Sequence, residues 1–272
     1  MIRCVYTDLD GTMLGHRASL FRDADGEWTM LAARALEACF RAGVEVVIKS
    51  GRRKAQVSEA ARLLGQTSYI FEVGSGMVID GEETFVTGDW QPRDGTSIHD
   101  QIAESGAPAL LLERYAGRFE HHAPFHLERQ VSHLFRGLVD VEDANALLES
   151  AGHAGLRLVD NGAIAPKPSL PDLDGPPHSY HLIPAGVSKG NAVAAHMRAR
   201  GYAREECIGV GDSREDLGVA DVVGRFFLVA NAVEKDPALH THIGGRPNVE
   251  ITEGRNGEGF YEAVVQSLAE AR

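Results

Sequence analysis

The sequence predicts an α/β protein whose core is a parallel β-sheet covered by helices on both faces. Short β-branched and aromatic runs alternate with amphipathic helical segments near the N-terminus, and the same alternation resumes near the C-terminus. Between them the pattern changes to hairpin signals and closely spaced strands, with a loop rich in Pro and Gly. We therefore expect residues 1–82 and 184–272 to form one α/β core, and residues 83–183 to form an inserted α+β domain.

The expected elements follow from local patterns. In the core, apolar runs predict strands, and apolar residues at helical spacing that end at Gly43, Gly65 and Gly201 predict helices. The expected core strands are 2–7, 44–50, 68–74, 206–213 and 226–232, and the expected core helices are 29–42, 53–64, 186–201 and 259–269. Around Asp80-Gly81, close to the boundary between core and insert, we expect a hairpin. In the insert we expect helices over 97–113 and 141–151, strands over 131–139, 156–164 and 179–183, and a loop over 166–177.

Composition narrows the function classes. A formal net charge of -12 argues against a nucleic-acid partner, because phosphate backbones attract clustered Lys and Arg. Three cysteines, far apart in the sequence, argue against a disulfide framework and are consistent with a reducing cytoplasm. Neither a secretory signal pattern nor an apolar run of membrane-spanning length is evident, so we expect a cytoplasmic protein with no membrane partner. The sequence does not indicate an oligomeric state.

Polar residues follow several of the expected strands. Asp8 and Asp10 follow the first strand, Ser50 follows the second, and Lys189 begins a late helix. Asp212 and Asp216 follow a late strand. Ligands of open α/β sheets bind outside the carboxyl ends of the strands, so we expect these side chains to converge on one crevice. A turn would explain any one of these features but not all of them.

The chemistry of these residues is complementary. Several carboxylates cannot all stay ionised in one place without a compensating cation. Carboxylate oxygens and water suit Mg²⁺, which commonly binds together with substrate phosphate. A carboxylate, a hydroxyl and an ammonium group beside that ion would form a phosphoryl-transfer site, in which an aspartate can act as the nucleophile.

The four segments resemble, in order and spacing, the four motifs of the haloacid dehalogenase superfamily of phosphatases. The segments are "DLDGT", "KSGR", "GVSKGNAV" and "GVGDSREDL". The resemblance implies a Rossmann-like core with a type C2B cap as the insert. "FEVGSGMVID", "HLIPAGVSKGNAV" and "GRNGEGFYEAV" are most similar to mannosyl-3-phosphoglycerate phosphatases and their sucrose-phosphatase and phosphomannomutase relatives. This resemblance therefore implies a Mg²⁺-dependent phosphomonoester hydrolase acting on a phosphorylated sugar or glyceryl-sugar.

The resemblance also implies a role for each motif residue. Asp8 attacks phosphorus and binds the metal, whereas Asp10 protonates the leaving oxygen, activates the hydrolytic water and reaches the metal through its backbone carbonyl. The remaining roles are phosphate binding by Ser50, Gly51 and Lys189, metal binding by Asp212 and Asp216, and support of the site by Thr12, Arg52, Ser213 and Glu215. Two departures from the family pattern are Glu215, where an Asn is usual, and Val73 in place of the Asn of "ENG".

The cap offers its own candidates for binding an anionic substrate, namely Arg129, His133, Arg136, Lys167 and His181. A solvated charged face is the alternative interpretation of each. His121, His122 and His126 suggest zinc, but the segment contains Pro124 and lacks a helical register that would make the rings converge.

Three other functions remain open. A sugar phosphomutase would use the same phosphoenzyme chemistry but return the phosphate to the substrate. A receiver-like signalling module would also gather acids, a hydroxyl and a lysine around Mg²⁺, although Asp10 and the inserted domain argue against it. A non-catalytic sugar-phosphate binder would not need Asp8 and Asp10 together.

Overall fold

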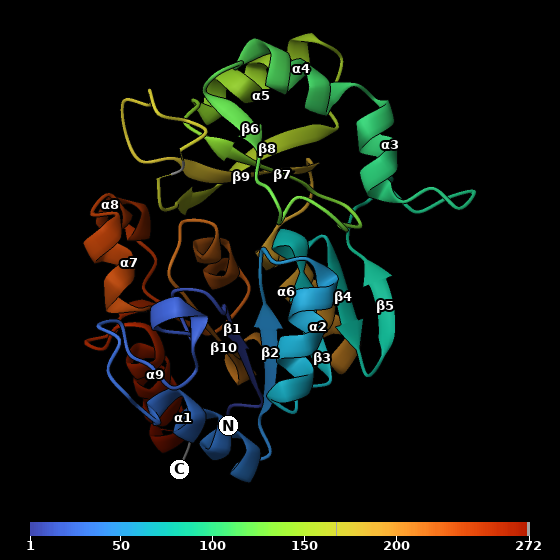
Figure 1. The fold of residues 1–272 in the computed structure, drawn as a ribbon. Helices are drawn as coiled ribbons and strands as arrows, with labels where there is room; N and C mark the ends of the chain where they lie inside the picture. The colour runs from blue at the N-terminus through green and yellow to red at the C-terminus, as the bar shows by residue number, and fades with distance from the viewer. Residues whose placement is uncertain (167, 271–272) are drawn as a thin grey trace.

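The computed structural model describes residues 1–166 and 168–270 and arranges them around two β-sheets. The larger sheet has eight strands in the order β12-β11-β10-β1-β2-β3-β4-β5, and it lies below the smaller sheet in Figure 1. Strands β12 to β3 in this order are parallel, whereas β4 and β5 are antiparallel at one edge. Since β1 pairs with both β2 and β10, the two ends of the chain share one sheet, and the predicted α/β core is confirmed.

The strands of the large sheet are short. They are β1 (Cys4–Thr7), β2 (Glu45–Lys49), β3 (Ser68–Phe71), β4 (Gly76–Ile79), β5 (Glu82–Phe85), β10 (Cys207–Gly211), β11 (Arg225–Leu228) and β12 (Val249–Ile251). Alternate side chains of the central strands enter different apolar clusters: Val5 and Val46 pack on one face, and Tyr6 and Val47 on the other. Both faces are therefore buried, as parallel sheets require.

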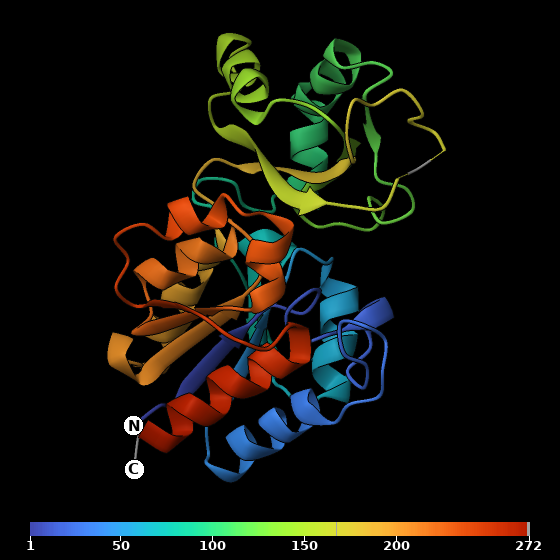
Figure 2. The ribbon, with the colours of Figure 1, turned by 90° about the vertical axis from the view of Figure 1, so that its left-hand side faces the viewer.

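Helices cover each face of this sheet. One face carries α1 (Leu31–Arg41), α2 (Lys54–Leu63) and α9 (Asn256–Glu270), with α1 and α9 side by side in Figure 2. The other carries α6 (Lys189–Arg200), the 3₁₀ helix Asp216–Asp221, α7 (Ala230–Lys235) and α8 (Leu239–Ile243). Ser188 caps the N-terminus of α6, where its side chain accepts a hydrogen bond from the Asn191 backbone N–H, and Gly201 caps the C-terminus in the left-handed conformation.

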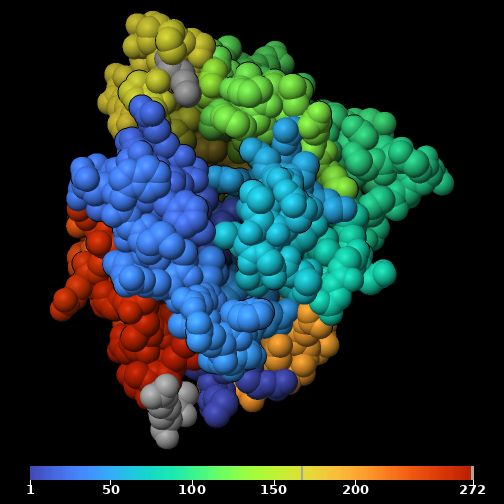
Figure 3. All heavy atoms as spheres, turned by 60° about the horizontal axis from the view of Figure 1, so that its bottom comes forward, coloured from blue at the N-terminus to red at the C-terminus, as the bar shows by residue number. Residues whose placement is uncertain are grey.

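The insert forms a cap on the core. Its antiparallel sheet has the order β6-β7-β9-β8, made of β6 (Phe119–His121), β7 (His133–Gly137), β8 (Leu156–Ala163) and β9 (His178–Pro184). Helices α3 (Ile98–Glu104), α4 (Ala107–Arg114) and α5 (Val141–Ser150) pack with it around a separate apolar cluster. In Figure 1, α4 and α5 lie on the side away from the core, so the opposite face of the sheet is turned toward it. Figure 3 shows cap atoms, in green and yellow, directly against core atoms, in blue and cyan.

The insert begins after a strand that belongs to the core. Strand β5 (Glu82–Phe85) pairs with β4 in the large sheet, although the sequence suggested that the core segment ends at residue 82. The hairpin itself turns at Asp80 and Gly81, which both have positive φ, as the sequence predicted. We therefore propose that the first core segment extends to Phe85.

Several elements differ from the expected ones. The helix expected over 97–113 is divided into α3 and α4 at Gly106, which adopts a φ of 83°. The strand expected over 226–232 ends at Leu228, and α7 follows, because an apolar run cannot by itself distinguish a strand from a buried helix. Strands β6 and β12 and helix α8 were not predicted, since each is too short to show a periodic pattern.

None of the helices formed by residues 1–166 and 168–270 is both long and apolar enough to span a lipid bilayer.

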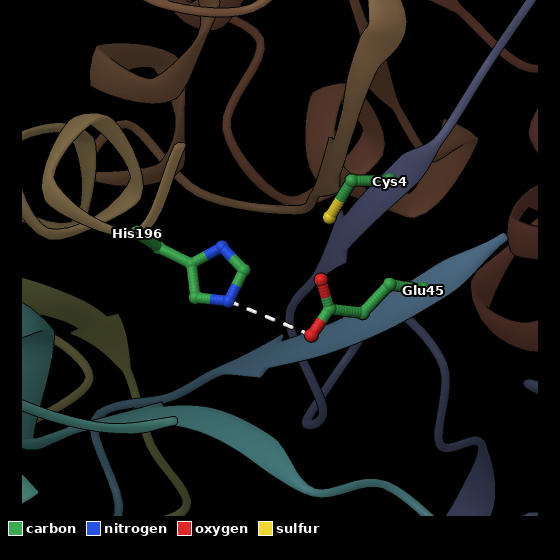
Figure 4. Close-up of side chains that lie close together, drawn as sticks. All are labelled: Cys4, Glu45 and His196. Carbon is green, nitrogen blue, oxygen red and sulfur yellow. Dashed lines mark ion pairs between the residues drawn. The ribbon is translucent and has the colours of Figure 1, made fainter. Parts of the chain in front are cut away.

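The side chains of Cys4, Glu45 and His196 form a largely buried cluster at the edge of the large sheet where β1 and β2 begin (Figure 4). One potential metal ligand from each residue lies within 4.8 Å of the other two. Both oxygens of Glu45, however, already accept hydrogen bonds from protein donors, namely Ser68, Arg200 and Tyr202. We therefore interpret the group as a structural network that joins β1 and β2 to α6.

This network should make the free energy of unfolding depend on pH in the acid range. Burial acts to raise the pKa of Glu45, but contact with His196 and hydrogen bonds from Ser68 and Tyr202 lower it to about 2. An unfolded Glu titrates near pH ~4.3, so Glu45 stabilises the fold above that pH and loses its contribution as the pH falls toward 2. We expect Glu45→Gln to lower the free energy of unfolding by about 1–2 kcal/mol at pH 6 and by less near pH 3.

Urea unfolding at the two pH values would measure this difference. Glu37→Gln is a suitable control, because Glu37 forms only an exposed ion pair with Arg41 on the surface of α1. An equal cost of Glu45→Gln at both pH values would contradict the expectation.

Candidate active site at the carboxyl ends of the strands

The structure places the polar residues of the four sequence motifs at one edge of the large sheet. Asp8, Ser50 and Asp212 directly follow β1, β2 and β10, which are neighbours in the sheet, and Lys189 is the first residue of α6. The cap covers this edge, and Asp8, Ser50 and Lys189 are all buried. Residues from both ends of the chain are therefore brought together beneath the cap.

Asp8 lies among other carboxylates. One carboxylate oxygen from each of Asp8, Asp212 and Asp216 lies within 4.8 Å of the corresponding oxygens of the other two residues. One oxygen of Asp8, Oδ2, is 3.4 Å from Lys189 Nζ, and the other, Oδ1, is buried with no hydrogen-bond partner among the described residues. Burial raises the pKa of Asp8 to about 7, with Lys189 opposing this effect and Asp216 adding to it.

The charges of the site are unbalanced without a further cation. Four buried or nearly buried carboxylates, those of Asp8, Asp212, Glu215 and Asp216, face three lysines: Lys49 and Lys189, which are buried, and the exposed Lys235, which lies 3.4 Å from Asp212 Oδ2. One negative charge is therefore left uncompensated when all of these groups are ionised. The potential ligand atoms of Asp8, Asp212 and Asp216 are all oxygens, and Asp8 Oδ1 has no hydrogen-bond partner in the part of the chain that the structure describes. These residues fit a hard divalent cation.

Lys49 and Lys189 share the carboxylate of Asp216. Asp216 Oδ1 is 2.6 Å from Lys49 Nζ and 3.0 Å from Lys189 Nζ, while Oδ2 accepts a hydrogen bond of 2.6 Å from Ser213 Oγ. Burial acts to raise the pKa of Asp216, but the two lysines hold it well below its usual range. Sequence reasoning missed Lys49, although a lysine within a strand covered on both faces was a signal.

Glu215, at the position where the family usually has Asn, lies against Lys189. Its Oε2 is 3.1 Å from Lys189 Nζ, and Oε1 accepts a hydrogen bond of 3.4 Å from the Lys189 backbone N–H. The additional negative charge is thus compensated within the site and holds the ammonium group from a second side.

The glycine of "DLDGT" is required by the approach of Asp212. Gly11 has a φ of 80°, and a Cβ at this position would lie 2.1 Å from Asp212 Oδ2. Thr12 Oγ1 donates a hydrogen bond of 3.2 Å to Asp212 Oδ1. The loop after β1 therefore both carries Asp8 and positions Asp212.

Asp10 forms an ion pair with Arg52 of the second motif and lies outside the cluster formed by Asp8, Asp212 and Asp216. Arg52 donates from Nε to Asp10 Oδ2 at 2.6 Å and from Nη2 to Oδ1 at 2.5 Å, and the Asp10 side chain is half exposed. The backbone N–H of Arg52 also donates to Ser50 Oγ. This fork keeps the Asp10 carboxylate beside the site without burying it.

The cap candidates fall into two groups. Arg129 donates to the carbonyl oxygen of Gly51, and His181 Nε2 faces the same glycine. His133 and Arg136 make their contacts inside the cap, with His99 and with Glu120. Lys167 lies outside the described residues. A cavity of about 530 Å³ opens at the cap linkers, around Trp90 and Pro184, rather than at the carboxylates.

Comparisons with known proteins show which enzymes this chain is similar to. The family model of haloacid dehalogenase-like hydrolases matches residues 173–248. A phosphoglycolate phosphatase of Archaeoglobus fulgidus is 25% identical over 96% of this chain and 95% of its own length. A phosphoglycolate phosphatase of Methanospirillum hungatei is 26% identical over 97% of this chain and 96% of its own length. The predicted resemblance to phosphatases of the haloacid dehalogenase superfamily is confirmed.

Two solved structures share the fold of this chain. A structure from Thermoplasma acidophilum has a TM-score of 0.68 and 18% identity, covering 98% of this chain and 99% of that one. The sucrose-phosphatase of Synechocystis, solved with sucrose and phosphate, has a TM-score of 0.65 and 15% identity, covering 98% of both chains. The predicted Rossmann-like core with a C2B-type cap is confirmed, as is the predicted class of enzyme, a phosphatase of this superfamily.

Proposed function

We propose that the chain is a Mg²⁺-dependent phosphomonoester hydrolase that forms an aspartyl-phosphate on Asp8. The observation that carries this proposal is the environment of Asp8. Its buried carboxylate lies beside Lys189 and close to Asp212, and one of its oxygens has no hydrogen-bond partner among residues 1–166 and 168–270. Three buried thiols also suit a reducing compartment, and we place the enzyme in the cytoplasm.

The chain's own residues supply the steps of the reaction. An oxygen of Asp8 attacks phosphorus while the bond from phosphorus to the leaving oxygen breaks, and Asp10 donates its proton to that oxygen. Asp10 then takes a proton from the water that attacks the phosphoenzyme, which frees Asp8 and inorganic phosphate. For both transfers Asp10 has to turn from Arg52 toward the substrate.

The other polar residues orient the phosphoryl group. Lys189 and Ser50 hold its oxygens, and Lys49, Asp216 and Glu215 keep the Lys189 ammonium in place. Oxygens of Asp8 and Asp212 and the backbone carbonyl of Asp10 would hold Mg²⁺, with Asp216 adjacent. The ion, when bound, supplies positive charge that offsets repulsion between a carboxylate nucleophile and a phosphate dianion.

Two substrate classes remain for this small-molecule phosphatase. The full-length relatives bear the name phosphoglycolate phosphatase, whereas the motif resemblance favours a phosphorylated sugar or glyceryl-sugar. The cap closes over the phosphate-binding loop through contacts to Gly51, so its side chains decide between them.

Phosphate release from a panel of phosphoglycolate, glyceryl phosphates and sugar phosphates tests the proposal. We expect EDTA to lower the rate by at least about a hundredfold, and excess Mg²⁺ to restore it. Conversion of one sugar phosphate isomer to another without phosphate release would indicate a phosphomutase. A stable phosphoaspartate without turnover would instead indicate the receiver-like alternative.

A further inference from the structure

The cap is attached to the core through the buried carboxylate of Glu72. This residue follows β3 in a left-handed conformation, with a φ of 47°, and its side chain is fully buried. Its two oxygens accept hydrogen bonds from the backbone N–H groups of Gln130, Val131 and Ser132. The hydroxyl of Ser132 donates a fourth hydrogen bond, of 2.8 Å, to Oε2. A carboxylate with four donors can only accept, so the Ser132 proton is committed to Glu72.

This commitment determines the role of the neighbouring histidine. Ser132 Oγ also accepts a hydrogen bond of 2.8 Å from Arg129 Nη1, which is always a donor. Ser132 Oγ also lies 3.4 Å from Nδ1 of His181, to which it can offer its remaining lone pair. Because Ser132 has no second proton to give, Nδ1 of His181 must carry the hydrogen in this contact.

The other ring nitrogen is therefore a bare acceptor. His181 is buried, and burial, together with the nearby charges of Arg129 and Lys189, lowers its pKa well below the usual range, so the ring is neutral. With Nδ1 protonated, Nε2 of a neutral imidazole carries only a lone pair.

Nε2 of His181 points toward the candidate active site. A Cβ added to Gly51 would lie 3.2 Å from Nε2 and 3.4 Å from the amide nitrogen of Asn161. Gly51 directly follows Ser50 in the loop after β2, so the missing side chain leaves the histidine against the phosphate-binding loop. When the cap closes on a substrate, this nitrogen faces the group attached to the phosphate.

We propose that His181 Nε2 accepts a hydrogen bond from a substrate hydroxyl, and that the Glu72–Ser132 relay holds the ring in the tautomer this requires. The proposal rests on the proposed phosphatase function and selects between its two substrate classes. A phosphate monoester bearing a nearby hydroxyl can donate to Nε2, with Asn161 beside it. The second polar group of phosphoglycolate is a carboxylate, which has no proton to donate and faces a lone pair instead.

The test compares two substrates that differ at one group. Phosphoglycolate carries a carboxylate where 2-hydroxyethyl phosphate carries a hydroxymethyl group, and both are short enough to share one pose. We expect kcat/KM to favour 2-hydroxyethyl phosphate by at least about tenfold. In His181→Phe this ratio should fall toward one. Tyr180→Phe is the matched control, because Tyr180 is the adjacent residue of β9 and its hydroxyl bonds Val139 in the cap interior, so the ratio should persist.

A second measurement needs no substrate and no variant at position 181. Nitrogen chemical shifts of the imidazole rings in the wild-type protein distinguish the two tautomers, and we expect His181 to be protonated at Nδ1. In Ser132→Ala the partner of Nδ1 is lost, so the ring should populate both tautomers. If His181→Phe does not fold, the proposal is still tested by the wild-type ratio of kcat/KM for the two substrates and by the tautomer of His181 in the wild-type protein.

A preference for phosphoglycolate, a ratio unchanged by His181→Phe, or an Nε2–H tautomer would each overturn the proposal. A wild-type protein that hydrolyses neither substrate nor p-nitrophenyl phosphate in Mg²⁺ would instead refute the proposed function. The tautomer measurement would still stand in that case, so the two failures are distinguishable.

Discussion

Replacing Asp8 with asparagine should lower phosphate release by at least about a thousandfold, because the variant has no nucleophile. The amide is nearly isosteric with the carboxylate, so the Lys189 side chain and the loop after β1 keep their surroundings. Acid-quenched enzyme should retain phosphate from a labelled substrate in the wild type and none in Asp8→Asn. Residual turnover above about a tenth of the wild-type rate would exclude the aspartyl-phosphate route.

The same substitution should stabilise the metal-free fold. Burial raises the pKa of Asp8 to about 7, whereas an unfolded Asp titrates near ~3.9. Ionisation is therefore less favourable in the folded chain, and the penalty grows as the pH rises from about 4 to 7 and is fully present above that range. In EDTA at pH 8, Asp8→Asn should melt at a higher temperature than the wild type.

A control separates this effect from a general effect of removing an acid. Asp80 forms an exposed ion pair with Arg200 far from the site, so Asp80→Asn should keep activity and gain no stability. Added Mg²⁺ should stabilise the wild type more than Asp8→Asn, since binding to the folded state adds its own free energy. A metal-free Asp8→Asn that melts below the wild type would contradict the interpretation of Asp8 as a strained carboxylate.

The approximate positions of the candidate site residues could be predicted from the sequence because of one geometric regularity. Parallel strands end at one edge, so Asp8, Ser50 and Asp212, each directly after an apolar run, had to lie near one another once those runs were recognised as neighbouring strands. The helix caps at Ser188 and Gly201 were equally local signals. The features that depend on strand ends and helix caps could therefore be predicted from the sequence alone.

The side-chain pairs that form between distant parts of the chain could not be predicted from the sequence. Lys49 meets Asp216 across 167 positions of sequence, and although a lysine in a strand covered on both faces must lie inside, nothing in "VVIKS" reveals which carboxylate it contacts. Glu72 adopts a left-handed conformation that no Gly or Asn announces, and it binds cap residues 130–132. The expected substrate residues His133 and Arg136 face partners inside the cap, because spacing does not tell which side of a short antiparallel strand faces the core.

Lys49→Met should have the largest effect on stability, about 3–5 kcal/mol in the free energy of unfolding. The Lys49 side chain is completely buried, and its ammonium lies 2.6 Å from Asp216 Oδ1 and 3.1 Å from the carbonyl oxygen of Val210. Methionine fills a similar volume but leaves Asp216 with Lys189 as its remaining cation. Lys54→Met, which removes a half-exposed ion pair with Glu83, should cost less than about 1 kcal/mol.

A double-mutant cycle shows whether the cost of Lys49→Met arises from the charge left on Asp216. In the Asp216→Asn background Lys49 loses the carboxylate that its ammonium group directly contacts, so the lysine itself becomes a buried charge without a contacting counter-ion among the described residues. The Lys49→Met substitution should then cost less than in the wild type by about 1–3 kcal/mol, measured by urea unfolding in EDTA. Equal costs in the two backgrounds would mean that Lys49 stabilises the fold by packing around Phe226 rather than through Asp216. In that event, the positioning of Lys189 would depend on Asp216 and Glu215 without Lys49.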